Sequence, residues 1–449
     1  MGPTGPGQAG PGAAPAALRV LDAVALVLGI VIGAGIFRSP SAVAGGAASG
    51  AGVLGLWLLG GLVSLAGALC YAELATAWPH RGGDYHFIGR AFGRGAAFLF
   101  AWARLTVIPT GSVALLAFVV GDYLAGVLGR PAASAPIAAL SVVALVALNV
   151  AGLRLAARFQ NALTVLVVGG LVAVIVAGLA GPAAAAPAAT AAADAAGPGV
   201  ALVFALLAYG GWNEAAYASA EVRGGRRAVA LALVASVGAV TVLYLLANVA
   251  YLRALGLEGV RGSSTVAADV LALRAGPAGA ALVALVVTIA ALTSANATLL
   301  LGSRLAWAFG REHHAFAPLG AWNARRDAPV NALLAQGGVA LLLVGFGAAS
   351  RRGFETMVAY TSPVFWAFFL LAGLSLFVLR RREPETPRPF RVPLYPLTPA
   401  LFCLACGYLL YASVAHAGPG AVLGLAVLAA GLVPLWWSVR AQARRPAPA

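Results

Sequence analysis

Two glycine clusters interrupt apolar stretches of the chain and could free backbone groups for binding. One lies in residues 28–37 (LGIVIGAGIF) and the other in residues 207–213 (LAYGGWN). A glycine weakens a helix by about 1 kcal/mol relative to alanine, and paired glycines let the backbone leave helical geometry. In hydrocarbon an unpaired NH or carbonyl group is costly, so a broken helix persists only where something polar satisfies it. We therefore expect a polar ligand or side chain at each break.

The two breaks offer opposite charges. A half-helix that begins after Gly35 presents free NH groups and about half a positive charge, which suit a carboxylate. Carbonyl groups freed around Leu207 to Gly210 suit an ammonium group. The backbone of an amino acid fits between them without any charged side chain. The predicted binding residues are Ile32, Gly33, Ala34, Gly35 and Ile36 at the first break and Leu207, Ala208, Tyr209, Gly210, Gly211, Trp212 and Asn213 at the second.

Close helix packing is the simpler interpretation of the glycines, because Gly29 and Gly33 have GxxxG spacing. The two clusters, however, occupy matching positions of apolar stretches that lie five spans apart. That separation is expected of two five-helix repeats of opposite topology whose first helices are both discontinuous. We therefore favour a binding site.

Several polar residues lie within or near the apolar spans, where a charge costs about 2.5 to 3.5 kcal/mol. Arg104 is either a coupling residue on the substrate path or a structural partner of Glu214, and Glu214 is either a protonatable gate or a brace for the second break. Thr293, Ser294 and Asn296 are either oxygen ligands for a sodium ion or residues that bond to their own helix.

Three charged residues lie closer to the ends of spans. Arg38 either attracts the anionic end of a substrate at the outer mouth or extends its side chain toward water. We interpret Glu73 and Glu221 as structural partners of arginines on the cytoplasmic side.

Membrane-spanning helices must position all these residues. The 449 residues are 61% hydrophobic and only 10% charged, whereas a soluble protein carries about 25% charged residues. Apolar stretches of about 20 residues predict about twelve spans. We expect an all-α polytopic membrane protein with a 5+5 inverted repeat, discontinuous helices 1 and 6, and two further C-terminal helices. The predicted spans lie near 20–45, 50–75, 95–121, 133–152, 159–181, 199–221, 227–252, 278–305, 329–348, 356–379, 396–415 and 420–439.

These spans predict a single transmembrane domain with short tails. Residues 1–18 form a disordered cytoplasmic tail, and residues 441–449 form a second one. Within the domain, the first repeat covers 19–182, the second covers 199–380, and helices 11 and 12 cover 396–440.

All 29 basic residues are arginine, since lysine is absent, and with 14 acidic residues the net charge is +15. The arginines concentrate in alternate connections, and the positive-inside rule then places both termini in the cytoplasm. We expect the protein in the cytoplasmic membrane of a bacterium. A nucleic-acid surface would gather its basic residues on one face, so we exclude nucleic acid as a partner and expect the lipid bilayer instead. The pattern leaves the oligomeric state open.

An enzyme in the membrane would need a nucleophile with a base, or a metal cluster, within the spans. None of the five histidines occurs in a predicted helix with a carboxylate or cysteine ligand at i+3 or i+4. We therefore expect no enzyme activity, no metal site and no cofactor beyond a coupling ion.

Motifs in the same order along the chain carry a resemblance that covers nearly its whole length. They are Gly33-Ala34-Gly35-Ile36-Phe37 with Ser39-Pro40, Tyr71-Ala72-Glu73-Leu74, residues 79–85 (PHRGGDY), residues 208–213 with Glu221-Val222, and Asn296 with Ser303-Arg304, Gly310-Arg311 and residues 329–332 (PVNA). In these residues the sequence resembles the amino acid/polyamine/organocation superfamily, and within it the bacterial amino acid permeases related to the L-type carriers. The resemblance implies the inverted-repeat fold, with the substrate carboxylate on span one and its amino group on span six.

Departures from the family pattern limit what the resemblance implies about coupling. Many sodium-independent relatives place a lysine in span five, and Val167 stands at that position here. Leu207 replaces the gating aromatic of span six, and Gly224 and Gly225 replace an asparagine-proline pair. Sodium symport, proton symport, exchange and facilitated diffusion therefore all stay open.

The combined expectation is secondary transport of L-amino acids by alternating access. The apolar surroundings of the breaks favour neutral substrates. Two alternatives are a cationic amino acid or polyamine antiporter of the same fold, and an amino acid sensor that no longer transports.

Overall fold

The computed structural model confirms an all-α polytopic membrane protein. It describes Leu28 and residues 31–80, 82–151, 153–181, 197–213, 225–263, 265–350, 352–415 and 418–443. Within these residues, nine helices are long and apolar enough to cross a membrane. In the same part of the chain the β-type pairing consists of an isolated bridge between Asn323 and Ala328.

The helices follow the order of the predicted spans. They are α2 (Gly35–Arg38), α3 (Pro40–Gly45), α4 (Gly50–Ala77), α5 (Asp84–Phe92), α6 (Arg94–Thr106), α7 (Ile108–Val127), η1 (Pro131–Ala133), α8 (Ser134–Ala151), α9 (Leu153–Ala180), α10 (Pro198–Ala208), α11 (Gly225–Gly262), α12 (Val266–Glu312), η4 (His314–Gly320), α13 (Val330–Ala349), α14 (Gly353–Arg382), α15 (Leu397–Ala415), α16 (Pro419–Ala430) and α17 (Leu432–Ala443).

Both helix breaks fall where the glycines predict them. Residues 32–34 are not helical, and the helix resumes at Gly35 as α2. Ser39 keeps helical dihedral angles (φ −77°, ψ −20°), so α2 continues directly into α3. In the sixth span α10 ends at Ala208, and a turn follows over residues 209–211.

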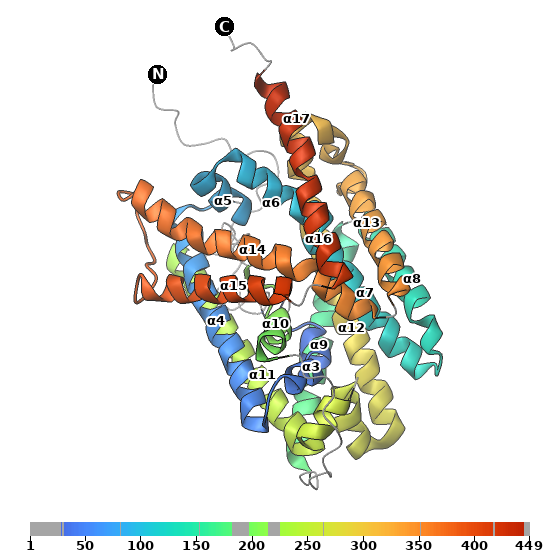
Figure 1. The fold of residues 1–449 in the computed structure, drawn as a ribbon. Helices are drawn as coiled ribbons and strands as arrows, with labels where there is room; N and C mark the ends of the chain where they lie inside the picture. The colour runs from blue at the N-terminus through green and yellow to red at the C-terminus, as the bar shows by residue number, and fades with distance from the viewer. Residues whose placement is uncertain are drawn as a thin grey trace.

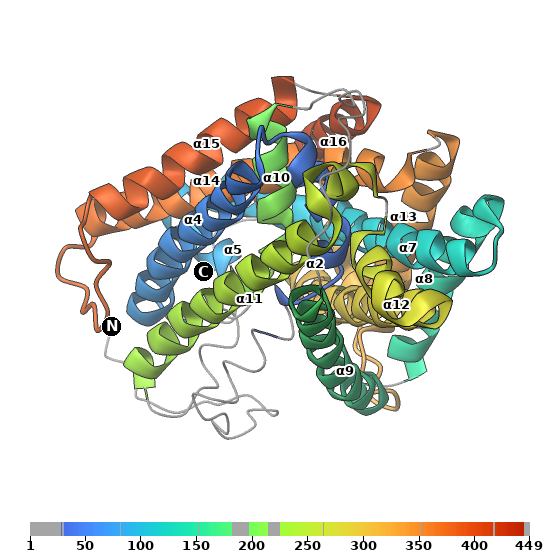
Figure 2. The same ribbon diagram turned by 90° about the horizontal axis from the view of Figure 1, so that it is seen from below.

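The broken helices lie in the interior of the bundle. α10 lies beside α4 and α15 (Figure 1, Figure 2). α10 also contacts α2 and α3, and α2 contacts α12. α14 and α15 run side by side, and α15 packs across α4 (Figure 1). The two breaks are therefore surrounded by intact helices.

Three features differ from the predicted spans. The third span is divided at Val107 into α6 and α7, because Pro109 in the first turn of α7 has no NH group to continue the ladder. α12 includes a segment before the predicted eighth span, with a kink at Gly276 (φ 59°) just before Pro277. α5 is an additional short helix between the second and third spans.

Some predictions fall on residues outside the described part of the chain. These are the tail at 1–18, residues 444–449 of the second tail, Gly29, Glu214, Glu221 and Gly224, whereas residues 441–443 belong to the end of α17. The proposed domain boundaries stay a prediction.

Candidate functional site

A cavity of about 190 Å³ lies between the two breaks. Its walls come from the first break, α10 and the turn after it, α6, α7, α12 and α14. The predicted residues that line it are Gly33, Ala34, Gly35, Leu207, Ala208, Gly210, Gly211, Asn213, Arg104 and Ser294. The remaining predicted residues that the structure describes lie outside the cavity wall.

The two broken helices approach each other at Gly35. A Cβ atom at this position would lie 2.6 Å from Cα of Ala208 and 2.9 Å from its Cβ. Because the nearer atom is backbone, no rotamer change could make room for it. A Cβ on Gly33 would lie 2.5 Å from Oγ of Ser294 on α12, a side-chain atom that can change rotamer. Glycine is therefore required sterically at position 35, where the breaks meet.

The hydroxyl of Tyr244 on α11 connects the breaks. Its oxygen lies 3.0 Å from the carbonyl oxygen of Val31 and 3.0 Å from that of Ala208. A phenol has one hydrogen to donate, so the two carbonyls share a single donor. Each carbonyl oxygen has two lone pairs and keeps capacity for another donor. Both Val31 and Ala208 line the cavity, so a ligand ammonium there could reach these oxygens.

The NH groups at the first break are oriented by the start of α2. Phe37 and Arg38 donate backbone hydrogen bonds to the carbonyl of Ala34, and Ser39 donates to that of Gly35. Gly35 and Ile36 belong to the first turn, which has no preceding helical turn to accept from their NH groups. At the second break, Gly210 donates to the carbonyl of Leu207 at 3.1 Å, so that carbonyl is already partly satisfied.

Four residues predicted at the breaks face away from the cavity. Ile32 and Ile36 are buried in the hydrophobic core. Tyr209 donates from its hydroxyl to the carbonyl of Trp57 on α4 at 3.0 Å. Trp212 packs edge-on against Tyr71 at 5.1 Å between ring centroids. These side chains hold the break against its neighbours rather than forming the cavity wall.

The three residues of span eight that were predicted as ion ligands make different contacts. Thr293 donates to the carbonyl of Ile289 in its own helix at 2.7 Å. Asn296 is fully buried and accepts from Nδ2 of Asn149 on α8 at 2.8 Å. Of the three residues predicted as ion ligands, Ser294 alone lines the cavity. The sodium site expected from these three oxygens stays a prediction.

Arg104 and Val167 are both buried. Arg104 is 8% exposed and lines the cavity from α6. Its predicted partner Glu214 is outside the described residues. Val167, at the position of the family lysine, is 1% exposed and packs in the core.

Sequence reasoning did not identify the wall that α14 contributes. Phe354, Thr361, Ser362, Phe365 and Trp366 of this helix all line the cavity. Thr361 donates to the carbonyl of Met357 at 3.0 Å, which leaves its oxygen lone pairs available to a ligand. A signal was present, because Thr361 and Ser362 precede Pro363 in the middle of an apolar span. Tyr244 carried no such signal.

Two ionic clusters lie toward opposite ends of α14. The Arg38 cluster joins Arg38 of α2 to Glu355 of α14 at 3.5 Å and to Asp122 of α7 at 3.9 Å. It assigns partners to Arg38, for which the sequence left two interpretations.

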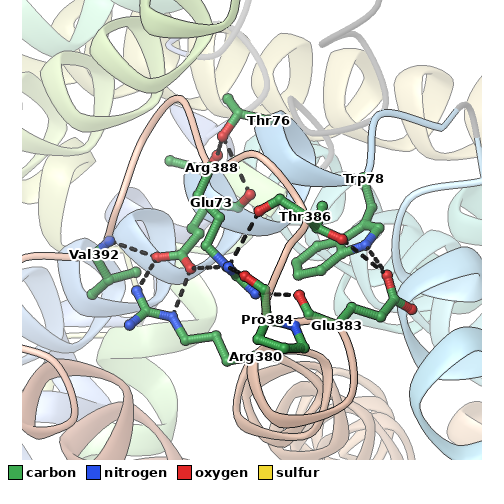
Figure 3. Close-up of polar contacts among 10 residues, drawn as sticks. Glu73, Thr76, Trp78, Arg380, Glu383, Pro384, Thr386, Arg388 and Val392 are labelled. Carbon is green, nitrogen blue, oxygen red and sulfur yellow. Dashed lines mark hydrogen bonds and ion pairs between the residues drawn. The ribbon is translucent and has the colours of Figure 1, made fainter.

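The Glu73 cluster lies at the other end of α14 and is shown in Figure 3. Glu73 of α4 accepts two hydrogen bonds from Arg380, at 2.7 and 2.5 Å, and one from the backbone NH of Val392 at 2.6 Å. Arg388 lies 3.6 Å from the same carboxylate. The prediction that Glu73 pairs with nearby arginines is confirmed by these contacts.

Comparison with known proteins assigns the chain to a family. Residues 18–433 match the amino acid permease family. The chain is 29% identical to the human b(0,+)-type amino acid transporter 1 over 408 residues, which cover 88% of this chain and 82% of the relative. It is also 29% identical to the human cystine/glutamate transporter, over 94% of this chain and 85% of the relative.

A third relative is the human large neutral amino acids transporter small subunit 2. It is 29% identical over 449 aligned positions, which cover 96% of this chain and 82% of the relative. The resemblance inferred from the motifs is thus confirmed over nearly the whole length. The chain belongs to the amino acid permease family of the amino acid/polyamine/organocation superfamily.

Proposed function

We propose that this protein carries neutral L-amino acids across the membrane by alternating access. The substrate carboxylate binds the NH groups at the start of α2, and its ammonium binds carbonyl groups of Val31 and Ala208. The observation that carries the proposal is that both breaks open into one cavity. Without a shared cavity, the two ends of a zwitterion could not be bound together.

The size of the cavity supports a small-molecule ligand. A water molecule needs about 10 to 15 Å³ of such space, whereas the cavity offers about 190 Å³. It is enclosed largely by apolar side chains with few polar groups, which is typical of small-molecule sites.

The chemistry of the lining favours neutral substrates. Away from the breaks the wall includes Leu115, Val119, Phe365 and Trp366, which suit an apolar side chain. Arg104 is the charged residue among the described lining residues, and no carboxylate is found among them. Among these described residues, a cationic amino acid or polyamine would therefore meet a like charge.

The fifth span has Val167 at the position of the family lysine, so no ammonium group links this span to the breaks. The two breaks are instead connected to each other by the hydroxyl of Tyr244 on α11. We infer that coupling does not depend on a protonatable group at position 167 and expect exchange with internal amino acid.

Uptake by proteoliposomes tests the proposal. Radiolabelled leucine, arginine and glutamate are offered with a sodium gradient, with a proton gradient, and with internal leucine. We expect leucine uptake that responds to internal leucine. Gly33→Leu and Gly210→Leu should abolish it while leaving membrane insertion intact, because the added side chains fill the cavity. Binding of amino acid without flux in every condition would favour the sensor, and normal uptake by both variants would rule out this site.

A further inference from the structure

One aromatic ring lines the cavity where α14 begins. Phe354 is the second residue of α14, is 5% exposed, and lines the cavity. Val119 near the end of α7 and Val203 in the first half of α10 line the cavity as well. Arg104, in the last turn of α6, lies in its wall too, so the cavity extends along the third span. By the charge pattern of the loops, the Phe354 end faces outside.

Contacts from two other elements hold the ring in place. The ring of Phe204 on α10 stacks near it, with centroids 6.4 Å apart and planes inclined by 22°. The guanidinium of Arg38 on α2 lies 5.0 Å from the centre of the Phe354 ring. Phe354 is thus in contact with both broken helices while belonging to neither.

The next residue of α14 adds a charged contact at the same place. Glu355 accepts from Nη2 of Arg38 at 3.5 Å, and Arg38 also lies 3.9 Å from Asp122. One arginine therefore contacts both the ring and the carboxylate that follows it. Breaking the Arg38 contacts would release the ring and α2 from each other.

We propose that Phe354 is the outer lid of the substrate cavity and that Arg38, through Glu355, is the latch that keeps it closed. The proposal rests on the proposed function and extends it to gating. Span six provides the smaller Leu207 at its break, where relatives carry an aromatic lid. The ring that covers the cavity comes from α14 instead.

The contacts of the lid are suited to repeated opening. The side chains of Glu355 and Asp122 are 48% and 41% exposed, so water can replace the ion pairs when they separate. Opening separates Arg38 from Phe354, Glu355 and Asp122, and Phe354 from Phe204, while the buried core of α14 stays packed.

Cysteine accessibility tests the lid. Ser112→Cys places a thiol in the cavity wall with little change in size. The natural cysteines Cys70, Cys403 and Cys406 are buried, and the parent protein measures their background. A membrane-impermeant methanethiosulfonate reagent is added outside sealed vesicles, and the labelling rate is measured without amino acid.

Removal of the ring should expose the reporter thiol. Adding Phe354→Ala should raise the labelling rate about tenfold, which corresponds to about 1.4 kcal/mol less stabilisation of the closed lid. The control Phe346→Ala removes a partly buried ring of α13 that does not line the cavity, and should leave the rate unchanged. The reagent added from the opposite side should not distinguish Phe354→Ala from its parent.

A second variant keeps the test decisive if Phe354→Ala inserts poorly. Arg38→Gln retains the ring and removes the latch, so labelling should increase by a smaller factor. Added salt should speed labelling of the Arg38-containing protein and not of Arg38→Gln. Labelling of both variants at the parent rate would overturn the proposal. Because no amino acid is present, this result is independent of whether the protein transports one.

Discussion

The Arg38 cluster and the Glu73 cluster hold opposite ends of α14 in different ways. At the Glu73 end the carboxylate side chain is fully buried, and Arg380 and Val392 donate to it at 2.5 to 2.7 Å. At the Arg38 end the ion pairs measure 3.5 and 3.9 Å, and the acidic side chains are 48% and 41% exposed. Removing one partner of a buried ion pair costs about 3 to 5 kcal/mol, whereas an exposed pair contributes about 0 to 1 kcal/mol.

This contrast indicates which end of α14 can move. The Glu73 cluster fastens the end of α14, and the loop that follows it, to α4 (Figure 3). The Arg38 cluster can separate at little cost. We therefore expect conformational change at the end that carries Phe354, with the other end fixed.

Glu73→Gln should have the largest effect. The substitution leaves the Arg380 and Arg388 guanidinium groups around a neutral amide in a buried site, which should lower the free energy of unfolding by about 3 to 5 kcal/mol. Unfolding of purified protein in detergent measures it. Glu385→Gln, at an exposed position of the following loop, is the control and should unfold like the wild type. Equal stability of both variants would remove the basis for a fixed end.

The second largest effect should be a loss of stability at low pH near the Glu73 cluster. Burial, the stacked ring of His80 at 4.2 Å, and Arg90 lower the pKa of His86 to about 4. Arg90 also binds Glu383, beside the Glu73 cluster. The unfolded chain has a histidine pKa of about 6.5, so unfolding takes up a proton and stability falls as pH drops from 6.5 to 4.

Hydrogen exchange measures where this acid effect acts. At pH 5, α5 should lose about 1 kcal/mol of protection after allowance for the partial exposure of His86, while the first turn of α14 should not change. His86→Gln should abolish the pH dependence in α5. A loss of protection in the first turn of α14 instead would contradict the assignment of the effect to His86.

Glu355→Gln should have the smallest effect on stability. Removing an exposed partner should change the free energy of unfolding by less than about 1 kcal/mol. The variant should nevertheless alter how uptake depends on salt, because Arg38 loses one of its two carboxylate partners. A decrease in the free energy of unfolding as large as that of Glu73→Gln would show that the two ends of α14 do not differ.

Much of the fold could be predicted from local sequence properties. Apolar stretches specify the spans, and glycine weakens a helix wherever it occurs, so the breaks at Gly33 to Gly35 and after Ala208 were accessible from the sequence. That Glu73 pairs with arginine was also predictable, since an unpaired charge at the end of a span is costly. Its main partner Arg380 lies 307 residues away and could be identified only from the packing of α4 against α14.

The remaining parts of the candidate site depend on tertiary contacts. Tyr244 lies in an ordinary apolar span, and only the approach of α11 to both breaks gives its hydroxyl two carbonyl neighbours. Phe354 resembles many other phenylalanines of the sequence until α2 and α10 are placed beside it. The orientation of Tyr209 and Trp212 away from the cavity likewise follows from packing against α4 rather than from the residues around the break.

Equilibrium binding to Gly35→Ala tests the shared site between the breaks most directly. A Cβ at this position would lie 2.6 Å from the backbone of Ala208, whereas a Cβ on Gly45 would meet nothing within 4 Å. Radiolabelled leucine should bind wild type and Gly45→Ala alike and should not bind Gly35→Ala, although all three proteins elute as folded monodisperse species. Binding of leucine to Gly35→Ala with wild-type affinity would contradict the proposal that the two broken helices grip the substrate together.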